Sequence, residues 1–128
     1  MSLENVITIH TKSLLRSRGL EATLQRGVAS EAVANRVMLG MSEAVATTSR
    51  EAKFEADTQE VLLLAADYRV AGVAVQPQRG DKFRVTRAGV ALTLEVLPQG
   101  DSEQCSRLDS SGVQLRVHTK ITKREPVV

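Results

Sequence analysis

The chain has 128 residues, which fits one domain, residues 1–128, with a single modest core. Its 17 basic and 15 acidic residues leave a formal net charge of +2, too balanced to indicate nucleic-acid binding by charge alone. Aromatic residues make up 2% of the sequence, so the core has to be built from Val, Leu, Ile and Ala. We therefore expect neighbouring subunits to supply part of the stability.

The single cysteine excludes an internal disulfide and a cysteine-based metal cluster, as is usual in a reducing compartment. No apolar run approaches the ~20 residues that span a bilayer. The N-terminus also lacks the basic start and continuous apolar stretch of a signal peptide. These features predict a soluble protein used in the cytoplasm, without a membrane partner.

Residues 1–18 are predicted to form an N-terminal helix. The apolar positions recur at helical spacing, and they are Leu3, Val6, Ile7, Leu14 and Leu15. The β-branched cluster at residues 6–9 favours a strand instead, whereas the basic last turn and Gly19 fit a helix end. A helix with one apolar face packs across the rest of the module or lies against a neighbour.

Residues 20–122 are predicted to form a small β-barrel or sandwich of about six short antiparallel strands. A first strand ends at the turn Arg26-Gly27, and residues 30–39 carry apolar side chains on both parities, as in a strand buried on both faces. The segment 41–57 is rich in Ser, Thr, Ala and charged residues. We expect an extended flexible loop there, ordered only by a partner.

The segment 58–68 gives conflicting signals. Asp57-Thr58-Gln59-Glu60 fits a helix cap, yet the apolar run at residues 61–64 has the length of a strand. Because the flanking elements read as strands, we predict a strand here.

The stretch from Pro77 to Lys120 predicts a β-meander. Turns at Gly80-Asp81 and Ala88-Gly89 separate two alternating strands, and a loop with Cys105 leads to a last strand at residues 113–120. Residues 123–128 are predicted to be a basic tail. Basic side chains gather near both ends: Lys12, Arg16, Arg18, Lys120, Lys123 and Arg124. Solvated ends explain them most simply, and docking onto an acidic partner surface is the alternative.

No catalytic, cofactor or metal site is predicted. His10 and His118 have no further ligand at short spacing, and the strand parity of His118 places it on the surface. Cys105 lacks a nearby histidine, so a buried, neutral thiol is expected. There is no Gly-x-Ser-x-Gly nucleophile elbow and no phosphate-binding glycine loop.

Two further patterns are better explained as turns. Arg79-Gly80-Asp81 spells an adhesion tripeptide, but glycine followed by aspartate is also a turn signal. Five carboxylates could in principle hold a cation, although their spacing matches no calcium loop. These are Asp67, Asp81, Asp101, Glu103 and Asp109.

Several short motifs resemble those of bacteriophage and prophage head–tail joining proteins. In chain order they are Arg26-Gly27, Glu60-Val61-Leu62-Leu63, Ala66-Asp67-Tyr68, Gly72, Pro77-x-x-Gly80-Asp81, Glu95-Val96, Cys105-x-Arg107-x-Asp109-x-x-Gly112 and Leu115-Arg116-Val117-His118-Thr119-Lys120. The resemblance covers residues 20–122, and its last block is the most specific. The chain departs from the family at Ser106 and Leu108, where a Trp and another aromatic residue are usual, so the partner contacts of that loop can differ.

The resemblance implies a non-enzymatic virion protein of a tailed phage, located at the neck and assembled in the host cytoplasm. It implies a homo-oligomeric ring of six or twelve copies that acts as a head–tail connector of the stopper type. Its partners would be portal or adaptor proteins above, tail-terminator or tail-tube proteins below, and packaged DNA in the lumen. On this reading the 41–57 segment and the basic tail become ordered on assembly.

Two other functions are compatible with a chain of this kind. A tail-terminator ring has a comparable size. A small β-barrel that binds nucleic acid belongs to a different class and needs exposed aromatic side chains for base stacking. The only aromatic residues are Phe54, Tyr68 and Phe83. An enzyme is disfavoured because no nucleophile–base pair is visible.

Overall fold

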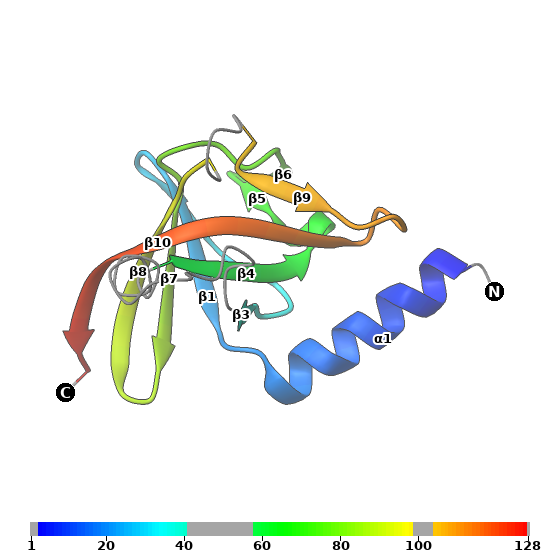
Figure 1. Cartoon of the computed structure of the whole chain (residues 1–128), viewed down its shortest axis with the longest axis horizontal. Helices are drawn as coiled ribbons and strands as arrows, with labels where there is room; N and C mark the ends of the chain where they lie inside the picture. The colour runs from blue at the N-terminus through cyan, green and yellow to red at the C-terminus, as the bar shows by residue number, and fades with distance from the viewer. Residues whose placement is uncertain (1–2, 41–57, 99–103, 128) are drawn as a thin grey trace, which may run out of the picture.

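The computed structural model describes residues 3–40, 58–98 and 104–127 (Figure 1). Helix α1 (Leu3–Arg18) precedes a mainly β body, in which one antiparallel sheet curls into a half-barrel. The predicted helix and the small barrel-like β-fold are confirmed. The predicted loop at 41–57 lies outside the described residues.

The curled sheet has the strand order β2-β1-β7-β8-β10-β4-β3, with β9 paired to β10 beside β8. Its strands are β1 (Ala22–Arg26), β2 (Ala29–Ala32), β3 (Met38–Gly40), β4 (Thr58–Leu64), β7 (Lys82–Arg87), β8 (Val90–Val96), β9 (Ser106–Leu108) and β10 (Gln114–Pro126). A turn of 3-10 helix, η1 (Ala65–Asp67), leads from β4 to a separate hairpin of β5 (Arg69–Val70) and β6 (Val73–Ala74). The strands outnumber the predicted six because several have only two to four residues.

Alternating side chains of the sheet supply the core. Alternate residues are buried over 83–85 of β7, 92–96 of β8 and 115–121 of β10, as a strand with one covered face requires. Phe83 and Tyr68 are both fully buried and meet edge to face, with ring centroids 5.7 Å apart. The rest of this core cluster is aliphatic apart from Cys105, as the composition predicted.

Helix α1 is held against the sheet by its C-terminal half. Thr11 and Leu15 are fully buried, and Gln114 Nε2 donates a hydrogen bond to Thr11 Oγ1 at 2.7 Å. A Cβ on Gly19 would lie 2.3 Å from the Leu15 carbonyl oxygen, so glycine is required where the helix ends. This packing outweighs the strand preference of the β-branched cluster at residues 6–9.

The single strand predicted at residues 30–39 is wrong. β2 ends at Ala32, the chain turns through Arg36 with φ +67°, and β3 begins at Met38. The turn inserts Val33 and Val37 into the same core. Odd- and even-numbered positions of residues 30–39 therefore both carry apolar side chains because the chain bends there, and not because one strand is buried on both faces.

The last strand is longer than predicted. β10 continues to Pro126 and pairs with β8 as far as Val90, with a register shift between Ile121 and Lys123. Residues 123–126, predicted as part of a basic tail, thus belong to the sheet. The strand predicted within residues 58–68 is confirmed as β4, which pairs with β10 and β3.

Candidate functional site

Three separate sequence motifs meet in one buried charged cluster. The Asp81 carboxylate accepts hydrogen bonds from Arg26 Nε and Nη2, both at 2.8 Å, and from the Tyr68 hydroxyl at 2.5 Å. The Gln78 amide donates a fourth bond at 3.0 Å. Asp81 is only 2% exposed, and the Arg26 side chain 28%. Bidentate pairing with Arg26 supplies the charge compensation that a buried carboxylate needs.

The electrostatics of this cluster hold all three groups in one protonation state. Burial is the largest influence on Asp81 and opposes ionisation, but the bonds from Arg26, Tyr68 and Gln78 outweigh it and hold the pKa of Asp81 below its ordinary value. Burial, then the hydrogen bond to Asp81, raises the pKa of Tyr68 well above its usual range. The bond to Asp81 also raises the pKa of Arg26. The cluster is a hydrogen-bonded ion pair with a structural role, and none of its three groups changes protonation near neutral pH.

Burial of Asp81 also decides whether the Arg79-Gly80-Asp81 tripeptide is an adhesion motif or a turn. Gly80 has φ +93°, and the Asp81 amide donates to the Gln78 carbonyl at 3.1 Å, so the segment is the predicted turn. An adhesion receptor reads an exposed aspartate, whereas this one faces Arg26. The tripeptide is therefore part of the fold.

Two of the other candidate carboxylates, Asp67 and Asp109, accept hydrogen bonds within the fold. Asp67 accepts a hydrogen bond from Asn35 Nδ2 at 2.9 Å. Burial opposes ionisation of Asp109, but hydrogen bonds from the Ser111 hydroxyl, at 2.7 Å, and from the amides of Gln114 and Val113, at 3.1 and 3.0 Å, outweigh it and lower the pKa of Asp109. The remaining two candidates, at positions 101 and 103, fall outside the described residues. Within the described ranges, no group of three or more His, Cys, Asp or Glu side chains could hold a metal ion.

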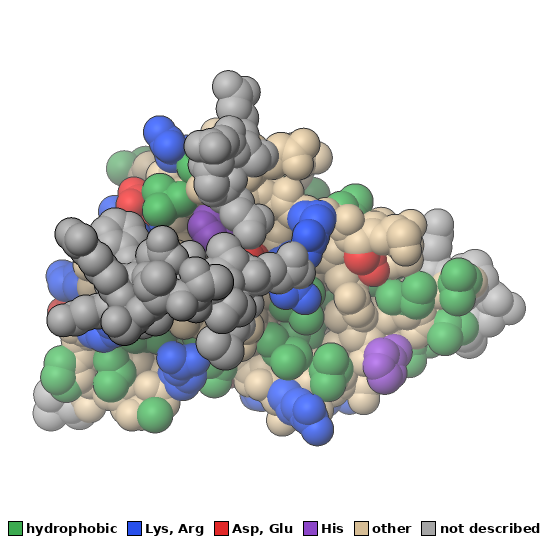
Figure 2. All heavy atoms as spheres, in the orientation of Figure 1, with side chains coloured by type: hydrophobic (Ala, Val, Ile, Leu, Met, Phe, Trp, Pro, Cys, Tyr) green, Lys and Arg blue, Asp and Glu red, His purple; other side chains and the backbone are tan. Residues whose placement is uncertain are grey.

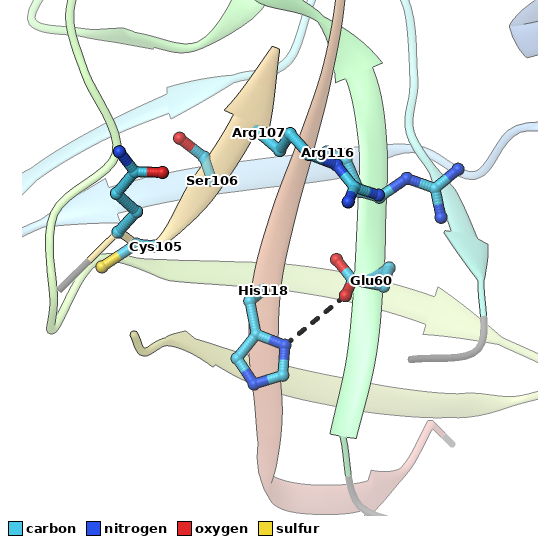
Figure 3. Close-up of a pocket in the computed structure, with 7 residues that line it drawn as sticks. Glu60, Cys105, Ser106, Arg107, Arg116 and His118 are labelled. Carbon is cyan, nitrogen blue, oxygen red and sulfur yellow. Dashed lines mark ion pairs between the residues drawn. The ribbon is translucent and has the colours of Figure 1, made fainter. Parts of the chain in front are cut away.

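A second cluster lies on the polar face of β4 and β10 and includes His118. Glu60 and His118 are cross-strand partners that turn toward one another, with His118 Nδ1 3.5 Å from Glu60 Oε1 (Figure 3). Their side chains are 4% and 12% exposed, respectively. The prediction of a surface histidine is therefore wrong, because strand parity does not reveal what covers a polar face. His10 on α1 is exposed.

A hollow of about 80 Å³ beside this pair has a polar lining. It is formed by Glu60, Gln104, Cys105, Ser106, Arg107, Arg116 and His118 (Figure 3). Among the described residues, no group hydrogen-bonds to His118 Nδ1. The sulfur of Cys105 points away from the His118 ring. The cluster thus lacks the nucleophile–base contact of a hydrolase.

Cys105 itself is buried, and burial raises the pKa of its thiol. We expect the folded protein to react with iodoacetamide at pH 8 at least about tenfold more slowly than the same chain in denaturant, because the thiolate is the nucleophile. Mass spectrometry of timed samples measures the two rates. Equal rates would show that Cys105 is open to solvent in the native state.

The most exposed apolar side chains of α1 form a surface of a different kind. Leu3, Val6 and Ile9 are 73%, 48% and 57% exposed, and we call them the helix stripe. They lie on the N-terminal half of α1, which extends past the sheet (Figure 1). Hydrophobic side chains gather at this end of the molecule in Figure 2. None of the helices in the described ranges is long and apolar enough to cross a membrane.

No curated protein and no solved structure significantly matches the chain. The sequence model of a family described as phage head-tail joining protein, however, matches residues 1–126. This match extends the resemblance noted at residues 20–122 to α1 and to the end of β10. Because it spans nearly the whole sequence, the chain belongs to the phage head-tail joining protein family and has a structural role at the junction of phage head and tail.

Proposed function

We propose that the chain is the subunit of a homo-oligomeric ring, of six or twelve copies, that acts as the stopper of a tailed phage. The ring closes the portal channel after DNA packaging and offers the surface to which the tail attaches. Portal or adaptor proteins contact it above, tail-terminator or tail-tube proteins contact it below, and packaged DNA reaches its lumen. The protein does no chemistry there. The observation that carries this proposal is the family match over residues 1–126.

Two structural features support a scaffolding role. The motif residues Arg26, Tyr68 and Asp81 hydrogen-bond to one another and so hold distant parts of the fold together. The helix stripe exposes apolar side chains that a free subunit has no reason to keep in water. A closed ring uses two different surfaces of each copy and covers such a patch.

The nucleic-acid-binding alternative is poorly supported. Tyr68 and Phe83 have no exposed surface, so neither offers a ring face on which a base could stack. Phe54 lies outside the described residues. A tail-terminator ring remains an outcome of the test below.

Deletion of the gene from the phage or prophage that encodes it tests the proposal. We expect packaged heads that lose their DNA and do not join otherwise normal tails, with joining restored when the purified chain is added. Electron microscopy of the restored necks should show a ring of six or twelve copies. Stable full heads together with tails of irregular length would identify a tail terminator, and normal infectious particles would contradict any role at the junction.

A further inference from the structure

An open groove lies beside β9. It runs between the segment 74–77 and β9 and has a volume of about 860 Å³, within the range of pockets that accept sizeable ligands. We call it the β9 groove. Apolar side chains line much of it, among them Val75, Pro77, Leu108 and Leu115, and Arg107 is the charged residue among its described lining residues. No carboxylate is among the described residues that line it. Leu108 is half exposed at its edge.

The helix stripe and the β9 groove belong to different sides of one copy. β4 and β9 flank β10 on opposite sides over residues 115–117. Helix α1 contacts β4, and the groove is bounded by β9. In Figure 1, α1 runs below β4, whereas β6 and β9 lie above β10. The stripe therefore does not fill the groove of its own copy.

We propose that the helix stripe of one copy docks into the β9 groove of the next copy around the ring. This inference rests on the proposed ring and names the two surfaces that close it. A projecting stripe and a separate groove are what a head-to-tail interface needs, since each subunit presents two different patches. A contact between two identical helix stripes would stop at a dimer.

The exposed apolar area of the helix stripe suits the centre of an interface, and the side chains around it must supply the rest of the buried area. The helix stripe leaves on the order of 300 Å² of apolar surface in water, a size typical of interaction patches. A stable interface removes about 800 Å² per partner, with an apolar centre and a polar rim. The stripe and the apolar groove lining supply that centre. The exposed side chains that flank the stripe, His10 and Lys12 among them, supply the rim.

Disulfide trapping tests the contact directly. In a Cys105→Ser background, which removes the only cysteine, Val6→Cys and Leu108→Cys are introduced into the same full-length chain. The variant is loaded onto portal-bearing heads and oxidised, because a disulfide forms only where two Cβ atoms approach to about 4 Å. We expect a ladder of covalent oligomers on a denaturing gel. Each single-cysteine variant should give at least about tenfold less cross-linked product.

Four outcomes separate this inference from the proposed ring. A ladder from the double variant, together with mixed dimers from a mixture of the two single variants, supports the contact. A ring seen by electron microscopy without the ladder overturns the contact and leaves the ring intact. Covalent dimers from Val6→Cys alone overturn it as well, because they show stripe against stripe. The absence of any ring overturns the proposed function.

A charge series gives a second, independent readout. Leu3→Lys with Ile9→Lys should reduce ring occupancy on heads at least about tenfold, since the ammonium groups would lose water in a groove whose described lining holds Arg107 and no carboxylate. Val28→Lys is the control for an added positive charge, because Val28 is fully exposed in the turn between β1 and β2. Circular dichroism before loading checks that both variants fold. Equal occupancy of the two variants contradicts the proposal.

Discussion

Replacing Asp81 with alanine should lower the free energy of unfolding by about 2–4 kcal/mol. The change leaves the half-buried Arg26 guanidinium and the buried Tyr68 hydroxyl without their shared acceptor. It also leaves the Gln78 amide without the Asp81 carboxylate that caps the turn. Chemical denaturation followed by circular dichroism measures the difference. A loss of this size would be a large part of the stability of a domain with so few aromatic side chains.

Two control substitutions separate the effect of the Asp81 charge on stability from the effect of its side-chain shape. Asp81→Asn keeps the volume and one acceptor oxygen, so its loss should be smaller than that of Asp81→Ala. Glu21→Gln changes an exposed carboxylate and should shift stability by less than about 0.5 kcal/mol. If Asp81→Ala and Glu21→Gln behave alike, the cluster does not stabilise the fold.

The same cluster makes the free energy of unfolding depend on pH in the acid range. Because the pKa of Asp81 is lower in the folded state than in the unfolded chain, its contribution is complete above the unfolded value of about 3.9. The contribution is lost as the pH falls through the folded value. The stability gap between wild type and Asp81→Asn should therefore be constant between pH 5 and 8 and shrink below about pH 4. A gap that widens on acidification would contradict the direction of the shift.

Phe83→Ala should be the most damaging single change in the core, with a cost of about 3–5 kcal/mol. Phe83 is fully buried on β7 and packs edge to face on Tyr68, so its removal opens a cavity beside the charged cluster. Soluble yield and thermal unfolding measure the effect, and we expect the variant to be largely unfolded at 37 °C. Phe83→Leu keeps most of the volume and should retain the fold with a smaller loss.

We also expect Phe83 and Asp81 to be energetically coupled. Tyr68 touches both Phe83 and Asp81, so the Phe83→Leu and Asp81→Asn changes should not be additive. A double-mutant cycle should give an interaction energy of at least about 0.5 kcal/mol. Strict additivity would mean that Tyr68 does not transmit the loss from one site to the other.

The sequence by itself determined the elements that depend on neighbouring residues. The two-residue turn at Ala88-Gly89, with φ of 52° and 77°, and the alternation of β7 and β8 follow from local pattern and were predicted. The motifs Arg26-Gly27 and Gly80-Asp81 were likewise visible as turns. Family membership was readable from short blocks spread along the chain, and the match over residues 1–126 agrees with it.

The tertiary structure alone decided how those blocks meet. Arg26 and Asp81 are 55 residues apart in sequence, and only the pairing of β1 with β7 brings them to hydrogen-bonding distance. Pairing between distant strands also set His118 against Glu60 and extended β10 past residue 122, and packing of Val33 and Val37 into the core accompanies the bend between β2 and β3. Periodicity assigns a side chain to one face of a strand, but long-range packing determines which partner covers that face.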